Sequence, residues 1–166
     1  MKFRDIINVY DDLSPFILNE TLDSSYPINR TETEGNVWLY YITIADKNYR
    51  IFIERINNDL HIGFERFNND AWEIDIITND LKASELLGIF GTIKNLLLKE
   101  TFNSVYVFTG NSKKKALYSR LIQKLRDKLN IELKLDFKFA SKNDVLFIYS
   151  DVVYKPTKFK YKIQKF

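Results

Sequence analysis

The sequence predicts an α+β fold with a mixed sheet, in which an antiparallel β-meander precedes a helix, a strand, a second helix and a β-hairpin. Between residues 37 and 78, short runs rich in β-branched and aromatic residues alternate with turns rich in Asn and Asp. After residue 79, two long segments carry apolar residues at every third or fourth position, the period of an amphipathic helix. At 166 residues, 45% of them hydrophobic, the chain is large enough to bury the core of one domain.

The first 36 residues carry the weakest structural signal. Four apolar residues from Phe3 to Tyr10 have helical spacing, whereas the polar run 29–36 predicts a loop. We therefore expect a single domain in three parts. These are an irregular or helical segment over 1–36, an α+β core over 37–153, and a basic aromatic strand or tail over 154–166.

Two hairpins make up the predicted meander. Residues 37–44 and 49–53 alternate with period two, which predicts two strands joined by a turn at 46–48, with isoleucine facing isoleucine. In the second hairpin, 61–67 is expected to pair with 72–78.

The charges predict the register of the second hairpin. With Phe67 opposite Trp72, Arg66 faces Glu73, which is attractive. A shift by one residue places Glu65 opposite Glu73, and such a like-charge pair costs about 0.2–1 kcal/mol. We therefore expect the register that pairs Phe67 with Trp72.

A helix capped by Asn79 and Asp80 and extending through Glu100 is predicted next. Gly88 and Gly91 lie on it, and each lowers helix stability by about 0.5–1 kcal/mol relative to alanine. These glycines predict close packing of a strand or helix against the helix. Its buried stripe is expected to be Leu86, Phe90, Ile93 and Leu97.

The stretch 101–128 predicts a buried strand, a turn and a basic amphipathic helix, and the rest of the chain is organised around it. The strand is centred on 104–108, and Gly110 permits the turn. Leucines recur every four residues in the helix and form one apolar stripe, while lysines and arginines cover its other sides. The stripe comprises Leu117, Leu121, Leu125 and Leu129, with Ile122 beside them.

The start of this helix is a candidate anion or phosphate site. A helix N-terminus offers unpaired N–H groups and a partial positive charge, and three consecutive lysines lie beside it. The alternative is a solvated helix face without a ligand. The candidate residues are Asn111, Ser112, Lys113, Lys114 and Lys115.

A final hairpin, with strands over 132–139 and 145–150 and a turn at 141–144, is predicted to complete the sheet. In the tail beyond 154, lysines alternate with aromatic residues, which suits single-stranded nucleic acid or a protein partner. The alternative is an edge strand whose lysines block further strand pairing. The residues that would contact a partner are Lys158, Phe159, Lys160, Tyr161 and Lys162.

Composition excludes several classes of chemistry. The absence of cysteine excludes disulfides, thiolate metal sites and cysteine nucleophiles. With His61 as its single histidine, the chain lacks the parts of hydrolytic triads and two-histidine metal sites. We therefore predict no metal site and no cofactor. The N-terminal residues lack the apolar core of a signal peptide, so we expect a soluble protein of the cytoplasm, without membrane contact.

The net charge of +3 is unevenly distributed. Residues 1–100 contain 10 Lys or Arg and 17 Asp or Glu, a net of −7, whereas residues 101–166 contain 15 and 5, a net of +10. Such a split favours an acidic partner or head-to-tail association between copies.

The order of elements after residue 79 resembles the C-terminal half of the GNAT acetyltransferases. In that family a strand is followed by an Asn and by a helix carrying Ala and Leu-Tyr, to which Asn111, Ala116, Leu117 and Tyr118 correspond. The resemblance implies a GNAT-like topology, with Tyr118 as general acid toward the departing thiolate of coenzyme A. The family's pyrophosphate loop needs closely spaced glycines, but residues 78–83 contain none and include an aspartate.

Residues 37–125 also resemble a group of uncharacterised small proteins of tailed bacteriophages. The shared features are an aromatic meander, a helix, a strand and a basic helix with an L-Y-x-R-L segment, here residues 117–121. The sequence therefore predicts a non-enzymatic, phage-encoded accessory or virion-associated protein that binds a host or virion protein or itself. One alternative is a GNAT-like acyltransferase or a remnant of one. The other is a nucleic-acid-binding protein that uses the basic C-terminal half.

Overall fold

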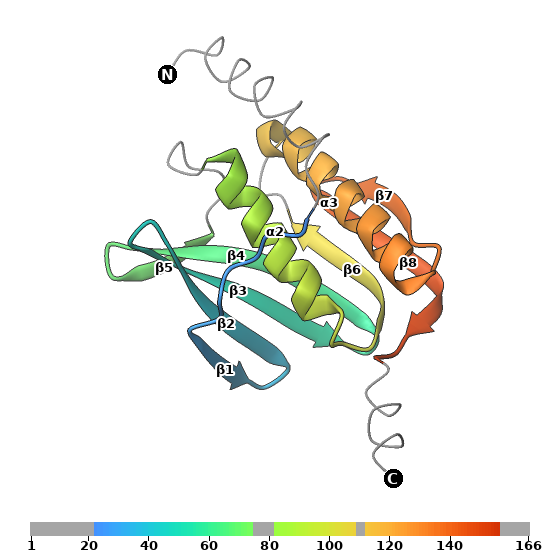
Figure 1. Cartoon of the computed structure of the whole chain (residues 1–166), viewed down its shortest axis with the longest axis horizontal. Helices are drawn as coiled ribbons and strands as arrows, with labels where there is room; N and C mark the ends of the chain where they lie inside the picture. Colours follow the sequence, from blue (N-terminus) through green and yellow to red (C-terminus); the bar gives the residue numbers. More distant parts are fainter. Residues whose placement is uncertain (1–21, 75–81, 109–111, 157–166) are drawn as a thin grey trace.

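The computed structural model describes residues 22–74, 82–108 and 112–156, which form one sheet and two helices (Figure 1). In chain order the strands before the first helix are β1 (Arg30–Glu34), β2 (Val37–Ile44), β3 (Lys47–Ile56), β4 (Asp59–Asn68) and β5 (Ala71–Ile74). The remaining elements are α2 (Ala83–Leu97), β6 (Phe102–Phe108), α3 (Ser112–Leu133), β7 (Lys138–Lys142) and β8 (Val145–Tyr154). This arrangement confirms the predicted α+β fold.

The eight strands form a single sheet in the order β1-β2-β3-β4-β6-β8-β7. β5 is outside this order and pairs with residues 65–68 of β4, whereas β6 pairs with residues 59–62 of the same strand. β4 and β6 are parallel over Asp59–Ile62 and Ser104–Val107, and the other pairs of described strands are antiparallel. β6 and β7 lie on either side of β8 and are both antiparallel to it, so they are parallel to each other. The connection from β6 through α3 to β7 is therefore a second crossover between parallel strands.

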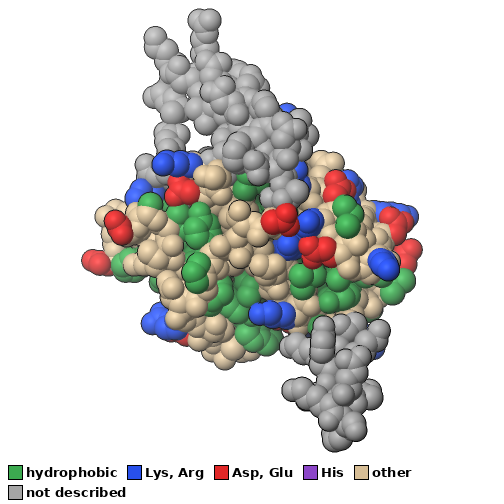
Figure 2. Space-filling model, viewed as in Figure 1, with side chains coloured by type: hydrophobic (Ala, Val, Ile, Leu, Met, Phe, Trp, Pro, Cys, Tyr) green, Lys and Arg blue, Asp and Glu red, His purple; other side chains and the backbone are tan. Residues whose placement is uncertain are grey.

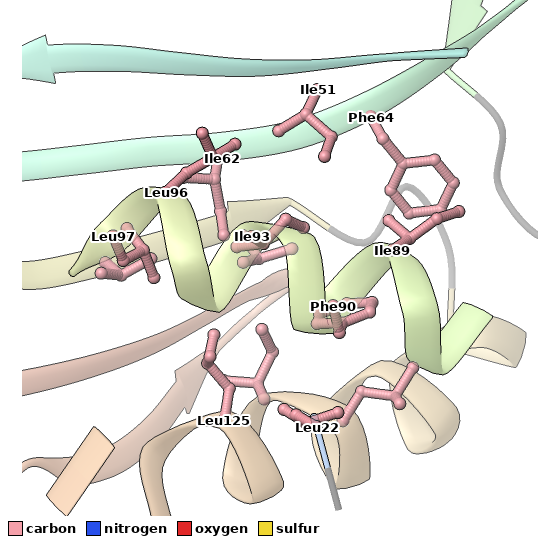
Figure 3. Packing of buried hydrophobic residues seen from close by; sticks show 14 of the residues in the cluster. Leu22, Ile51, Ile62, Phe64, Ile89, Phe90, Ile93, Leu96, Leu97 and Leu125 are labelled. Carbon is pink, nitrogen blue, oxygen red and sulfur yellow. The ribbon is translucent and has the colours of Figure 1, made fainter. Parts of the chain in front are cut away.

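Both helices pack on the same face of the sheet, where they form one core with it. The leucine stripe predicted for α3 is 0–3% exposed, and the stripe predicted for α2 is equally buried, so both predictions are confirmed. Figure 3 shows α2 between Ile51, Ile62 and Phe64 of the sheet and Leu125 of α3. Full burial of each such side chain stabilises the fold by about 1.5–3 kcal/mol.

The register of the β4–β5 hairpin is the predicted one. Phe67 lies opposite Trp72, and Arg66 lies opposite Glu73. In the β2–β3 hairpin, however, the expected pairing of isoleucine with isoleucine is wrong, because Ile51 faces Tyr40 and the turn is shorter than predicted. That turn consists of two residues at 45 and 46, whose φ angles are 48° and 65°. Turns with two positive φ angles match the twist of the flanking strands, so they set the register.

The polar run 29–36, predicted to be a loop, contains strand β1. All five residues of β1 are exposed, so the strand carries no apolar alternation from which it could be recognised. It is held by its pairing with β2 and by the Tyr41 hydroxyl, which donates a hydrogen bond of 3.0 Å to the Glu32 carboxylate.

Three helix boundaries differ from expectation. α2 begins after Lys82, whose N–H donates to the Glu85 carboxylate at 2.9 Å, and it ends at Leu97 rather than at residue 100; the predicted caps at 79 and 80 lie outside the described residues. The strand predicted over 132–139 is wrong, since α3 continues through Leu133 and β7 begins at Lys138. The leucine period of α3 extends to Leu133, and helical packing prevails over the short alternation that follows.

The segment 22–28 packs across α2, where Leu22 belongs to the core and Tyr26 and Ile28 pack against it. Leu22 is 1% exposed, and the Tyr26 N–H donates a 2.7 Å hydrogen bond to the Thr92 hydroxyl. A Cβ on Gly88 would lie 2.5 Å from the Tyr26 ring, and one on Gly91 would lie 1.8 Å from the carbonyl oxygen of Ser24. The predicted close packing at the two glycines is confirmed, but the neighbour is an irregular segment rather than a strand or helix.

We expect Gly91→Ala to lower the free energy of unfolding by about 1–3 kcal/mol, the usual cost of overpacking, although alanine is intrinsically the better helix former. The atom in the way is a backbone oxygen, so the chain at Ser24 must shift. Chemical denaturation measures the change. Asn95→Ala, at an exposed position of the same helix, is the matched control and should change stability by no more than about 0.5 kcal/mol. Equal effects of the two substitutions would contradict this packing.

Candidate functional site

One face of the sheet has no described helix or strand over it. Since successive side chains of a strand point to opposite faces, the residues between the core positions point away from α2 and α3. On β3, for example, Ile51 and Ile53 enter the core, whereas Arg50 and Phe52 point away from it. We call the surface formed by these outward side chains the open face.

The open face is rich in apolar and aromatic side chains. A sheet face in contact with water normally carries polar residues at alternate positions of each strand. In β2, β6 and β8, however, both the inward-pointing and the outward-pointing positions carry apolar residues, a two-phase pattern. This two-phase pattern was the available sequence signal for the open face, and sequence reasoning missed it. The apolar members considered below are Leu39, Tyr41, Phe52, Phe67, Trp72, Tyr106, Phe147 and Tyr149.

An aromatic row crosses the centre of the open face from β4 to β8 and consists of His61, Tyr106, Phe147 and Tyr149. His61 stacks on Tyr106 with a centroid distance of 5.0 Å and an interplanar angle of 14°, and Tyr106 stacks on Phe147 at 5.2 Å and 24°. Phe147 and Tyr149 lie 5.8 Å apart at 39°. The inner rings therefore cover one another's faces and leave their edges for contact with another molecule.

Beside this row, Phe52 lies over the backbone of β4. A Cβ on Gly63 would lie 2.5 Å from the Phe52 ring, so the missing side chain makes room for the ring. Leu39 is the cross-strand neighbour of Phe52 and is 8% exposed. Phe52 and Leu39 extend the apolar centre of the open face toward β2.

A second feature of the open face is the arginine–tryptophan cluster, formed by Arg30, Tyr41, Arg50, Phe67 and Trp72. The guanidinium carbon of Arg50 lies 4.5 Å from the Trp72 ring centroid, and that of Arg30 lies 4.1 Å from the Tyr41 ring centroid. Tyr41 and Phe67 contact Trp72 with centroid distances of 5.5 and 5.2 Å. A hollow of about 470 Å³ adjoins the cluster. Arginines and large aromatic residues together are typical of protein interfaces.

Arg50 is fixed in this cluster by the Glu65 carboxylate at 3.1 Å. Partial burial disfavours the charged guanidinium, but hydrogen bonds to Glu65 and Tyr41 and the negative charge of Glu65 outweigh this effect and raise the pKa of Arg50. The pair is therefore a neutral unit of fixed geometry.

Charges of opposite sign lie at opposite edges of the open face. At the β1 edge are Glu32 and Glu34, which we call the acidic rim, and Glu54 lies farther in, on β3. At the β7 edge are the exposed Lys138 and Lys142, the basic rim. Charges of the opposite sign also lie beside each rim. Arg30 lies 3.2 Å from Glu32, and Asp151 lines a hollow of about 290 Å³ with Lys138.

The candidate anion site at the start of α3 is only partly described. Asn111 lies outside the described residues, and Ser112, Lys113 and Lys114 lie in the first turn of α3 with side chains outside the described set. Lys115 donates a hydrogen bond to the Asn143 carbonyl of the β7–β8 turn, so it joins the helix to the hairpin. Farther along α3, Arg126 pairs with Asp127 at 2.8 Å and Lys128 with Asp23 at 3.0 Å, which neutralises part of the expected cationic surface.

The other predicted site residues do not form a described site. Tyr118 is 4% exposed in the core, where its ring centroid lies 6.3 Å from that of Phe64 and 6.1 Å from that of Phe90. The tail residues Lys158 to Lys162 lie outside the described residues. Within the described ranges, no group of three or more acidic or histidine side chains is arranged to hold a metal ion, and no helix is long and apolar enough to cross a membrane.

No protein-family model, curated protein or solved structure matches this chain. The resemblances to the GNAT acetyltransferases and to proteins of tailed bacteriophages stay predictions.

We expect Glu65→Gln to lower the free energy of unfolding by about 1–3 kcal/mol, because it removes the charged partner of Arg50, whose side chain is 19% exposed. Glu32→Gln is the matched control, since it removes the partner of Arg30, which is 61% exposed, and should cost at most about 0.5 kcal/mol. Urea denaturation distinguishes the two. A loss of the same size in both variants would show that the Arg50–Glu65 pair is not specially stabilising.

Calorimetric titration with acetyl-CoA is expected to give no saturable heat at millimolar ligand. Tyr118 lies in the core between two phenylalanines, and residues 78–83 contain no glycine to approach a pyrophosphate. A second titration, with inorganic pyrophosphate in place of acetyl-CoA, tests separately whether residues 78–83 bind a pyrophosphate. Saturable heat with acetyl-CoA would favour the acyltransferase alternative.

Proposed function

We propose that the protein is a non-enzymatic protein-binding module and that it binds its partner through the open face of the sheet. The observation that carries the proposal is that three strands of the sheet, β2, β6 and β8, have apolar side chains on both faces, while both described helices cover the same face. Apolar surfaces rimmed by polar residues mark interaction sites. In β-sandwiches, two sheets bury such apolar faces against each other.

The geometry of the aromatic row favours protein over nucleic acid. Proteins that bind single-stranded nucleic acid stack its bases on the exposed faces of aromatic side chains. Here His61, Tyr106 and Phe147 already stack on one another, so ring edges are what remain for a partner. The acidic rim also opposes a phosphate backbone. An apolar protein surface can bind ring edges and carries no phosphates for the acidic rim to repel.

The expected partners are a host or virion protein or a second copy of the chain, met in the host cytoplasm. Host and virion proteins follow from the resemblance to tailed-bacteriophage proteins, and self-association follows from the charge split between residues 1–100 and 101–166. Each of these partners would present a protein surface to the open face.

Site-specific photo-crosslinking tests the proposal without knowledge of the partner. A crosslinking amino acid at Tyr149, which is 37% exposed on the open face, should yield a discrete protein adduct when the tagged chain is irradiated in a host lysate. The same residue at Asn95, exposed on α2, is the control and should yield none. The proposal is overturned if adducts form equally from both positions, if none forms, or if the adduct is nucleic acid.

A further inference from the structure

We propose that the partner is a second copy of this chain, bound open face to open face about a two-fold axis parallel to the strands. This inference rests on the proposed function, because it names the occupant of the same surface. Three features support it: the apolar centre, the opposite charges of the two rims, and the positions of the rims at opposite edges of the sheet.

The strand order makes the open face self-complementary. A two-fold axis between facing sheets and parallel to the strands places β1 of one copy over β7 of the other, β2 over β8, β3 over β6, and β4 over β4. The acidic rim of each copy then meets the basic rim of the other, so the attraction occurs twice. An axis across the strands places β1 over β1 and brings like charges together. Charge therefore selects the first arrangement, since complementary potentials set orientation.

The registers place the opposite charges at the same level along the strands. One cross-strand line, in which each member pairs with the next, connects Glu34, Val37, Glu54, His61, Tyr106, Phe147 and Ala140. Glu32 and Lys142 each lie two residues from this line on the same side of it. In the two-fold arrangement Glu32 comes over Lys142 of the second copy.

The centre of the proposed interface is apolar and has partners for its charges. Val37 of one copy comes over Phe147 of the other, and Leu39, two residues along β2, comes over Val145 of β8, while Phe52 comes over the end of β6 beyond Tyr106. Glu54 comes over β6, where the Tyr106 hydroxyl can donate a hydrogen bond to its carboxylate. The Arg50–Glu65 pair enters the interface already neutralised. Apart from Glu54 and this pair, the centre is apolar and aromatic and the rims are charged, as in stable protein interfaces.

Sedimentation equilibrium of the purified full-length chain tests the arrangement. The wild type is expected to be a dimer at micromolar concentration, and Phe147→Asp should make it monomeric. Asn95→Asp, an exposed change on the helix side, is the matched control and should leave the dimer intact. A monomeric wild type, or a dimer that Phe147→Asp does not weaken, overturns the proposal.

Charge reversal of the rims provides the sharper test, because all four residues are exposed and the variants should fold. The acidic-rim variant Glu32→Lys/Glu34→Lys and the basic-rim variant Lys138→Glu/Lys142→Glu should each dissociate at concentrations at least about tenfold higher than the wild type at low salt. Mixed in equal amounts, they should form a heterodimer, because their rims are again opposite in charge. Failure of the mixture to associate better than either variant overturns the two-fold arrangement.

The experiment separates this inference from the proposed function. If the purified chain is monomeric but the crosslinker at Tyr149 still captures another protein, the second copy is the wrong occupant and the open face remains a protein-binding surface. If the purified chain is monomeric and Tyr149 captures nothing, both proposals fail.

Discussion

Two consecutive crossovers of the same hand are the constraint on which the rest of this structure depends. β4, β6 and β7 run in the same direction, and connections between parallel strands of one sheet are right-handed almost without exception. Since both connections step in the same direction across the sheet, α2 and α3 must lie on the same face. Their apolar stripes bury that face (Figures 1 and 3), and the described chain holds no further helix for the other.

The two sides of the molecule consequently differ in chemistry. Figure 2, viewed in the same direction as Figure 1, shows Lys, Arg, Asp and Glu side chains interspersed with hydrophobic patches on the described surface of the helix side. The open face instead carries rings in contact with rings across neighbouring strands, with acidic side chains at the β1 edge and lysines at the β7 edge. The fold thereby gathers apolar and aromatic side chains on the face that no described helix covers, and the proposed binding function rests on that arrangement.

Sequence reasoning succeeded where one local pattern had one physical solution. The leucine period of α3 could be buried on one side alone, and the charges of Arg66 and Glu73 chose the register of their hairpin. It failed where a pattern was absent or ambiguous. β1 has no apolar residue to reveal it, and the alternation after Leu129 fits both a helix end and a strand. The open face was missed because, when both faces of a strand carry apolar residues, the sequence does not show on which face the helices pack.

By itself the sequence determined the α+β class, the two amphipathic helices, the strand at 104–108 and the unequal distribution of charge, since each depends on neighbours along the chain. The tertiary structure alone decided that the segment 22–28 packs on Gly88 and Gly91, that Tyr118 is enclosed by Phe64 and Phe90, and that His61, Tyr106 and Phe147 form one row. These contacts join residues far apart in the sequence. They arise from strand order and crossover direction, which no local period encodes.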